Sequence, residues 1–304
     1  ICSSLAIMIT LRTDLLICID GPTTHHHIVL CIYTKDSAYL AHKNLPTQQM
    51  SWKTIVFKYG NNMNQLCKEK IIAHRGLSAS HPENTLIAFE AAKNAGIDWI
   101  ETDISMLKDE ELIIFHDKTL GRTVSGEKNI SDCVWAELIN ADAGIWKGEK
   151  YTGEKLLSLF DALSWAEKNG VTLILEMKCY GARQRRLAEV MANFLNPWQK
   201  EHLIISSFDI EFLHHFGKVA PEMRLASIHS DMPEDVEYLT RTLGLEAMHL
   251  KSDLVLSKGS VQEFHNQGLD VRVWTVNDLQ TASALIAVGV DMVMSDCPQV
   301  LLGK

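Results

Sequence analysis

The sequence predicts an α/β fold of the TIM-type (β/α)8 barrel class, and three observations support this prediction. From Lys70 onward, short apolar runs rich in β-branched residues alternate with amphipathic helical stretches, as βα units around a buried parallel sheet do. The repetition continues over roughly 230 residues, the usual size of one such barrel. Several predicted helices end just before a glycine, the residue preferred at a helix C-cap.

Nine apolar runs are strand candidates, one more than an eight-stranded barrel needs. The second and third runs are too close together for a helix to lie between them. We therefore expect an irregular, helix-free connection there and one run outside the eight. The candidates are Ile71–Ala73, Trp99–Ile104, Leu112–Phe115, Thr172–Met177, Leu203–Ser206, Leu225–Ile228, Ala247–Leu250, Val271–Thr275 and Met292–Met294.

Helices are expected between most of these runs, because a parallel pair of strands needs a crossover connection. The clearest candidates each stop at or just before a glycine. They are Thr85–Asn94, Leu156–Lys168, Val261–Asn266 and Leu279–Val288.

The chain divides near Asn64. Residues 1–62 show no sustained period of 2 or 3.6 and begin with Ile, so we interpret them as an N-terminal extension, unassigned or not translated. The run His25, His26 and His27 lacks a third type of metal ligand at a useful spacing and is interpreted as a local cluster. A start at Met63 leaves the barrel domain, residues 63–304, complete.

Composition narrows the class of partner. The 304-residue chain carries a formal charge of -9 and shows no block of Lys and Arg, so we expect a small-molecule partner and no nucleic acid. The apolar stretch from Ser4 to Asp20 is interrupted by Arg12 and Asp14, which argues against membrane insertion. The seven cysteines are scattered and form no CxxC pair, as in a cytoplasmic protein with reduced thiols. The oligomeric state is left open.

Ionisable residues gather where the predicted strands end. Active sites of barrels lie at the carboxyl ends of the strands, and side chains two positions apart on a strand point the same way. Glu101 and Asp103 therefore share one direction, as do Glu176 and Lys178. The residues concerned are His74 and Arg75 after the first run, Glu101 and Asp103 on the second, His116 after the third, Glu176 and Lys178 on the fourth, and Trp274 on a late one.

These residue types suit the cleavage of a phosphodiester. Three carboxylates, Glu101, Asp103 and Glu176, form an oxygen-only site of the kind that Mg2+ or Ca2+ prefers. Two histidines, His74 and His116, titrate near neutrality and can act as a general acid and a general base. The two cations, Arg75 and Lys178, can bind phosphate.

The motifs around these residues resemble the glycerophosphodiester phosphodiesterase family of the phosphatidylinositol-phospholipase-C-like superfamily. The resemblance runs from Ile71 nearly to Pro298 and continues weakly through its last third. Its elements are His74-Arg75-Gly76, Pro82-Glu83-Asn84-Thr85, Ile100-Glu101-Thr102-Asp103, His116-Asp117 with Leu120 and Arg122-Thr123, Glu176-Met177-Lys178, Ser206-Ser207-Phe208, Val273-Trp274-Thr275-Val276-Asn277 and Ser295-Asp296-Cys297-Pro298.

The resemblance implies a TIM barrel with a divalent cation on Glu101, Asp103 and Glu176 and acid–base catalysis by His74 and His116. The products implied are sn-glycerol 3-phosphate and an alcohol. It also implies that Trp274 forms a wall of the glycerol pocket, that Glu83 and Asn84 support the site, and that a small insertion follows the third run, between Lys118 and Tyr151. The sequence departs from the family at Glu110, which stands where a turn glycine is usual.

Some alternatives stay open. Asp296 either caps the last helix or positions a catalytic histidine. A phospholipase-type phosphodiesterase of the same superfamily would need an apolar rim or interfacial segment, which the sequence does not show. A non-catalytic phosphate-binding barrel would be expected to lack a histidine or a metal ligand, and none is missing.

Overall fold

The computed structural model describes residues 29–34, 37–42, 48–49, 65–181, 183–257 and 261–304. The chain divides into two compact units, Ile1–Asn62 and Met63–Lys304. In the first unit, β1 (Val29–Thr34), β2 (Ser37–His42) and β3 (Gln48–Gln49) form an antiparallel sheet in chain order, which the search for periodicity did not predict. The histidines at positions 25–27 and Met63 lie outside the described residues.

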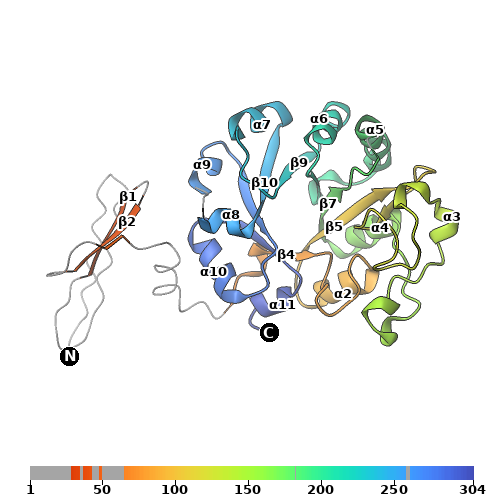
Figure 1. Ribbon diagram of the computed structural model, residues 1–304, viewed down its shortest axis with the longest axis horizontal. Coiled ribbons are helices and arrows are strands. Elements are labelled where there is room, and N and C mark those ends of the chain that lie inside the picture. Colours follow the sequence, from red (N-terminus) through yellow and green to blue (C-terminus); the bar gives the residue numbers. More distant parts are fainter. Residues whose placement is uncertain (1–28, 35–36, 43–47, 50–64, 182, 258–260) are drawn as a thin grey trace. The chain divides into compact units, whose positions relative to one another are not determined.

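The second unit is a closed parallel barrel (Figure 1). Neighbouring strands follow chain order, and β4 pairs with both β5 and β12, which closes the ring. The TIM-type prediction is confirmed. Within the described residues the eight barrel strands are β4 (Ile71–His74), β5 (Trp99–Met106), β7 (Thr172–Met177), β8 (Leu203–Ser207), β9 (Arg224–His229), β10 (Leu245–Lys251), β11 (Asp270–Trp274) and β12 (Met292–Ser295).

The third apolar run is the one outside the eight. It forms β6 (Leu112–Ile114), which pairs antiparallel with the end of β5. The helix-free connection is therefore a hairpin, and β5 runs two residues beyond the predicted Ile104. Glu110 lies in the hairpin turn with φ of 67°, a left-handed conformation that favours the glycine usual there.

Helices connect most of the strands and surround the barrel (Figure 1). Side-chain caps begin four of them; Ser158 caps α4, so that helix starts three residues later than the predicted Leu156. No helix in the described part of the chain is long and apolar enough to cross a membrane. The helices are α2 (Leu86–Asn94), α3 (Trp135–Leu138), α4 (Leu159–Asn169), α5 (Gln184–Leu195), α6 (Ile210–Val219), α7 (Val236–Leu243), α8 (Ser252–Ser257), α9 (Val261–His265), α10 (Leu279–Ala287) and α11 (Pro298–Leu301).

Alternation along the strands produces two apolar layers. Side chains such as Leu250 and Val273 face the helices and join the larger core, whereas Ile72, Ile174 and Met294 belong to a separate cluster inside the barrel. Each buried aliphatic side chain contributes roughly 1.5–3 kcal/mol to stability. Polar side chains lie at both ends of this cluster: the predicted carboxylates lie toward the carboxyl ends of the strands, and the buried Arg272 of β11 pairs with Glu246 near the amino end of β10.

An insertion follows β6, as predicted, and has its own apolar core that includes Ile130, Cys133 and Leu138. It contains α3 and the short 3-10 helices Ile130–Asp132, Ile145–Lys147 and Glu149–Tyr151. Two hydrogen bonds tie it to the loop after β4: Lys147 Nζ donates to the Ser78 carbonyl at 2.7 Å and the Tyr151 hydroxyl to the Ser80 carbonyl at 2.6 Å. The insertion is therefore fixed beside the loop that follows His74.

Candidate active site

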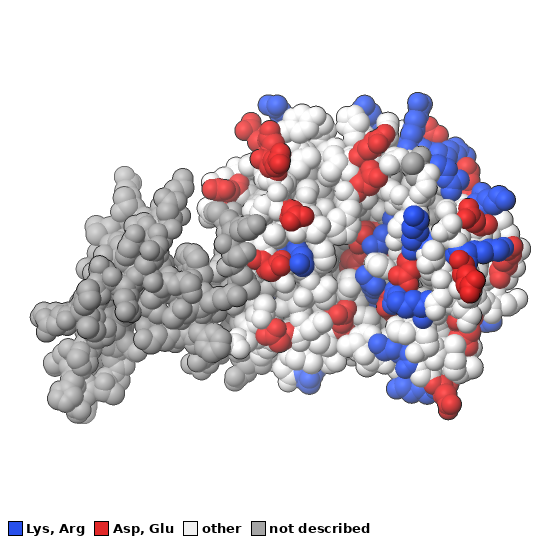
Figure 2. All heavy atoms as spheres, in the orientation of Figure 1, with Lys and Arg blue, Asp and Glu red and all other residues white. Residues whose placement is uncertain are grey.

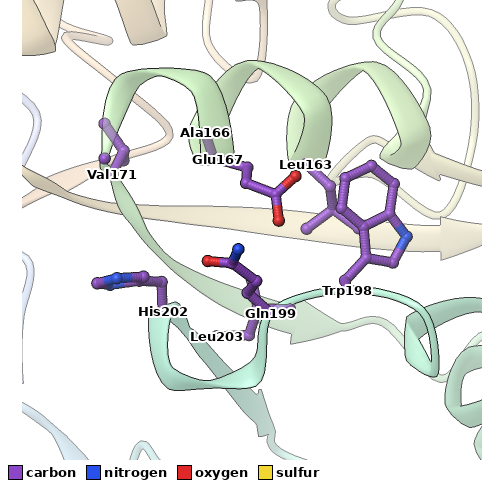
Figure 3. Close-up of a pocket in the computed structure, with 9 residues that line it drawn as sticks. Leu163, Ala166, Glu167, Val171, Trp198, Gln199, His202 and Leu203 are labelled. Carbon is purple, nitrogen blue, oxygen red and sulfur yellow. The ribbon is translucent and has the colours of Figure 1, made fainter.

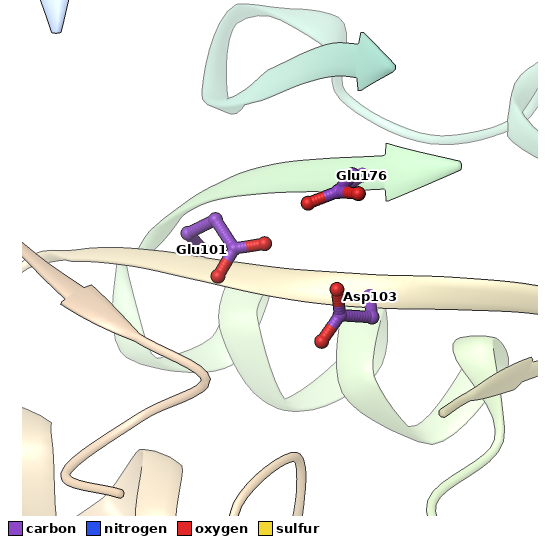
Figure 4. A group of neighbouring side chains, drawn as sticks. All are labelled: Glu101, Asp103 and Glu176. Carbon is purple, nitrogen blue, oxygen red and sulfur yellow. The ribbon is translucent and has the colours of Figure 1, made fainter. Parts of the chain in front are cut away.

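Three carboxylates meet inside the barrel (Figure 4). Glu101 and Asp103 lie on β5 and Glu176 on β7, with Asp103 directly beside Glu176 in the strand register. One oxygen of each lies within 4.8 Å of one oxygen of the others, and all three residues are buried. The structure thus brings together the three predicted metal ligands.

Burial makes this cluster electrostatically costly. Burial, together with the neighbouring Asp103, raises the pKa of Glu101 to about 8, and the same two causes raise the pKa of Glu176. Both carboxylate oxygens of Glu101 lack a hydrogen-bond donor among the described residues. Because unpaired buried oxygens favour a cation, the donor set fits a divalent metal ion.

Two cationic side chains partly compensate the cluster. Lys178 Nζ lies 2.9 Å from Asp103 Oδ1 and forms a hydrogen bond with Glu176, while Arg75 Nε lies 3.0 Å from Asp103 Oδ2. Burial alone would raise the pKa of Asp103, but Lys178 and Arg75 hold it well below its usual range. Both predicted phosphate-binding cations therefore border the carboxylate cluster.

The loop after β4 carries its residues in strained conformations. Arg75 and Asn84 have φ values of 59° and 60°, and the Asn84 amide N–H donates to the Arg75 carbonyl. The Asn84 side chain donates to Asp103 Oδ2 at 2.7 Å and accepts from the Thr102 hydroxyl at 2.8 Å, so it orients one carboxylate of the cluster. At Gly76 a Cβ atom would come within 2.7 Å of the Ala88 backbone, and only glycine fits there.

His74 ends β4, and its side chain is held by a residue that follows β12, the neighbouring strand. Its Nδ1 lies 2.6 Å from Asp296 Oδ1, and the other oxygen of Asp296 accepts from the Asn277 amide at 2.8 Å. A carboxylate cannot donate, so Nδ1 carries the hydrogen and Nε2 faces Glu101 Oε2 at 3.8 Å. Burial disfavours the charged ring, yet Asp296 and Glu101 raise the pKa of His74 above its ordinary value. Of the two readings of Asp296, the geometry favours the contact with the histidine, since α11 has no side-chain cap.

His116 follows β6 and is held in the same way by its neighbour in sequence. Its Nδ1 lies 2.8 Å from Asp117 Oδ1, and its carbonyl accepts a hydrogen bond from the Tyr180 hydroxyl. Burial lowers the pKa of His116. Each histidine therefore has Nδ1 engaged and Nε2 available for proton transfer.

An aromatic pair lies at the carboxyl ends of β8 and β11. The rings of Phe208 and Trp274 meet edge to face with their centroids 5.6 Å apart, and Lys178 Nζ lies 6.0 Å from the centre of the Phe208 ring. Phe208 is 46% exposed, an unusual exposure for a large apolar ring. Phe208 thus offers apolar surface beside Lys178, and Trp274 extends that surface.

Sequence reasoning assigned no role to several residues that contact the predicted set, among them Asp117, Arg122 and Phe208. Asp117 and Arg122 stand in the same short motif as His116, and that proximity was the available signal. The predicted supporting residue Glu83 is in contact, since its Oε1 accepts from Arg75 Nη1 at 2.8 Å.

A small cavity of about 90 Å³ lies elsewhere, beside the amino ends of β7 and β8 (Figure 3). Leu163, Trp198 and Leu203 form much of its wall, with Glu167 and His202 at its side. It lies at the barrel end opposite the carboxylates, where residues serve stability more than chemistry.

Surface charge is mixed. On the face drawn in Figure 2, acidic and basic side chains lie next to each other over the described part of the chain, and no continuous basic band is visible. Local cations such as Arg75 and Lys178 therefore matter more to an anionic ligand than the charge of this face.

Comparisons with known proteins agree with this geometry. The chain is 28% identical over 236 residues to a glycerophosphodiester phosphodiesterase of Caldanaerobacter subterraneus, covering 77% of this chain and 97% of the relative. Among solved structures, a phosphodiesterase of Oleispira antarctica in complex with the product sn-glycerol 3-phosphate is 32% identical, with a TM-score of 0.71 over 76% of this chain and 94% of that one. A glycerophosphodiester phosphodiesterase of Agrobacterium tumefaciens, 22% identical, shares the fold with a TM-score of 0.66, covering 77% of this chain and 99% of that one. Residues 74–300 match the glycerophosphoryl diester phosphodiesterase family, and the chain belongs to it.

Proposed function

We propose that this chain is a divalent-cation-dependent phosphodiesterase that hydrolyses glycerophosphodiesters to sn-glycerol 3-phosphate and an alcohol. One observation carries the proposal: three buried carboxylates form a cluster, and the two predicted histidines each have Nδ1 held by an aspartate. Membership of the family and the product bound in the Oleispira antarctica relative support the same substrate class.

The cation is proposed to be Mg2+ or Ca2+, held by Glu101, Asp103 and Glu176, because all three ligands are hard oxygens. Bound there, it would neutralise a phosphate oxygen and supply charge stabilisation. Arg75 and Lys178 are proposed to bind the remaining phosphate charge from the two sides of Asp103.

The two histidines are proposed to divide the proton transfers. One Nε2 removes the proton of the attacking hydroxyl as a new P–O bond forms, and the other Nε2 gives a proton to the leaving alcohol oxygen. We favour the substrate's own 2-hydroxyl as the nucleophile, because the reacting atoms are already joined. The product of that step is a cyclic glycerophosphate, which water opens with the two histidine roles exchanged.

Trp274 and Phe208 are proposed to pack against the carbon face of the glycerol. The Phe208 ring borders Lys178 and the Trp274 ring packs against Phe208, so the apolar wall begins next to the charge that would hold the phosphate.

We also propose that the protein is cytoplasmic, as the scattered cysteines indicate, and that its barrel domain begins at Met63. Cys67, Cys133, Cys179 and Cys297 form no disulfide.

Release of glycerol 3-phosphate from a panel of glycerophosphodiesters, with and without EDTA, tests the proposal. Chelation should abolish turnover, and Mg2+ or Ca2+ should restore it. Full turnover in excess EDTA would exclude the metal-dependent mechanism. A cyclic intermediate, and slow reaction of diesters without a 2-hydroxyl, would support internal attack, whereas equal rates would favour water as the nucleophile. Cleavage of phospholipids in preference to glycerophosphodiesters would favour the phospholipase alternative.

A further inference from the structure

Arg122 forms a double bridge at the edge of the candidate active site. Its guanidinium lies against two carboxylates and makes two contacts to each. Nε and Nη2 donate to the two oxygens of Asp117 at 2.7 and 2.9 Å. Nη1 and Nη2 donate to the two oxygens of Glu83 at 2.8 and 2.7 Å. Such forked contacts fix both the distance and the plane of each carboxylate.

Each of these carboxylates also contacts a residue of the proposed mechanism. Asp117 Oδ1 accepts from Nδ1 of His116 at 2.8 Å, and Glu83 Oε1 accepts from Nη1 of Arg75 at 2.8 Å. Glu83 is thus held from two sides, and its side chain is only 12% exposed. It is the fixed end of the bridge, whereas Asp117 has His116 as its other partner.

We propose that Arg122 is a positioning residue for His116: anchored on Glu83, it holds the Asp117 carboxylate, which in turn orients the imidazole with Nδ1 protonated and Nε2 free. The inference rests on the proposed role of His116. A single hydrogen bond to an unheld carboxylate permits many ring orientations, because the carboxylate itself can rotate. Two forks remove that freedom and favour one tautomer.

His74, the other proposed catalytic histidine, is held by a different set of hydrogen bonds. Asp296, the partner of His74, accepts from the hydroxyl of Ser78 and the amide of Asn277, and none of these groups contacts Arg122. Removal of Arg122 should therefore disturb His116 and leave His74 in place. This difference separates a positioning effect from a general loss of structure.

The chain offers a matched control. Arg186 on α5 has a similarly exposed side chain and also contacts two carboxylates, those of Glu110 and Glu189. It belongs to the surface between α5 and the β5–β6 hairpin, away from the described site. Arg186→Ala removes the same chemical group without touching His116 or its partner.

The experiment measures kcat and KM of Arg122→Ala in three backgrounds: wild type, His116→Ala and His74→Ala, each with saturating Mg2+. In wild type we expect kcat to fall roughly 10- to 100-fold, as for the loss of an outer residue that orients a functional group. The fall should shrink below about 2-fold in His116→Ala and persist in His74→Ala, because interacting residues are non-additive. Arg186→Ala should leave kcat unchanged.

Two further variants protect the test from misfolding. Arg122→Lys retains the charge but cannot form two forks, so it should lower kcat almost as much as Arg122→Ala. Free guanidinium should partly restore Arg122→Ala and should not restore His116→Ala. Unchanged kcat in Arg122→Ala, or an equal fall in all three backgrounds, would overturn the proposal. So would a fall that disappears in Arg75→Ala and not in His116→Ala, since Arg122 would then act on Arg75.

A measurement without turnover separates this proposal from the proposed function. The ring nitrogen NMR signals of His116 should show the Nδ1-protonated tautomer in wild type and a mixture in Arg122→Ala, with His74 unaffected. An unchanged tautomer would refute the positioning role. If the wild-type protein cleaves no glycerophosphodiester, the proposed function fails, and the NMR result alone then decides whether Arg122 positions His116.

Discussion

Replacement of Glu101 by Gln should stabilise the metal-free protein while it weakens cation binding. In the fold, burial and the neighbouring Asp103 raise the pKa of Glu101 to about 8, from an ordinary value of 4.5. The unfolded chain is ionised at pH 7, whereas the folded carboxyl is mostly protonated. Folding must therefore take up a proton, and at roughly 1.4 kcal/mol for each pH unit between 4.5 and 7 this costs about 3 kcal/mol.

Glutamine has nearly the same shape and carries no charge in either state, so Glu101→Gln removes this cost. The direction of the pKa shift determines the pH range in which the variant is more stable than wild type. A carboxyl whose pKa is raised on folding destabilises the fold above its unfolded pKa, and the effect grows until the folded pKa is reached. The two proteins should be equally stable near pH 4, and the variant should be ahead by about 3 kcal/mol at pH 7. For a domain of this size that corresponds to about 6–12 °C in Tm.

Urea and thermal unfolding in EDTA, at pH 4 and pH 7, measure the difference. Glu263→Gln, an exposed change on α9, serves as the control and should shift nothing. Addition of Mg2+ or Ca2+ at 1,000 times its Kd should reverse the order, because such a ligand stabilises wild type by about 4.1 kcal/mol and should bind the variant poorly. A variant no more stable than wild type at pH 7 would refute the reasoning. An equal difference in stability between variant and wild type at both pH values would show that the difference arises from packing.

The remaining predictions concern other parts of the molecule. His74→Ala and His116→Ala should each lower kcat on the order of 10²-fold or more, while cation binding measured by calorimetry stays near wild type; a substrate with an acidic leaving group should rescue only the variant that lacks the acid. A chain that starts at Met63 should match the full chain in turnover and Tm, and clear destabilisation would count against the boundary. Asp296→Asn should lower the free energy of unfolding, measured in EDTA, most strongly between pH 3.8 and 6.5. The lowered pKa of Asp296 stabilises the fold above pH 3.8, and the raised pKa of His74 stabilises it fully only below pH 6.5. A loss of equal size at pH 9 would contradict that pairing. Trp274→Ala should raise KM for glycerophosphodiesters, and an unchanged KM would show that Trp274 does not line the glycerol pocket.

The barrel could be predicted from sequence because its strands are buried on both faces. Continuous apolar runs such as Thr172–Met177 stand out from the amphipathic helices, and that strand begins and ends where predicted. The second and third runs were harder to interpret. Both are apolar and β-branched, so composition could not show that Leu112–Ile114 turns back against β5 instead of joining the ring.

The clustering of the proposed metal ligands could be predicted because it depends on local geometry. Glu101 and Asp103 lie two positions apart on one strand, and alternation alone directs both into the barrel. The partner of His74 depends on long-range geometry instead. Asp296 lies 222 residues away in sequence, and the contact exists because β12 pairs with β4 when the ring closes. Sequence could only offer the contact as one of two alternatives.

The contacts of Arg122 depend on side-chain direction in loops, where no period constrains the pattern. Asp117 and Glu83 come from two different loops, and the guanidinium joins them across 39 residues of sequence on the Glu83 side. A motif placed Arg122 near His116, but only the packing of the insertion shows which groups its five N–H donors meet.

Charge balance in the site suggests an order of binding. With all groups ionised, the three carboxylates and the two cations Arg75 and Lys178 leave one net negative charge in a buried space. Without metal, a proton on Glu101 offsets that charge near pH 7, so the empty site offers a phosphodiester no net positive charge, which matters most where water is excluded. A divalent cation first turns the net charge to plus one, and the phosphodiester then neutralises it. Substrate affinity should therefore depend on the cation, and the buried carboxylates, costly to the empty fold, are what make that dependence possible.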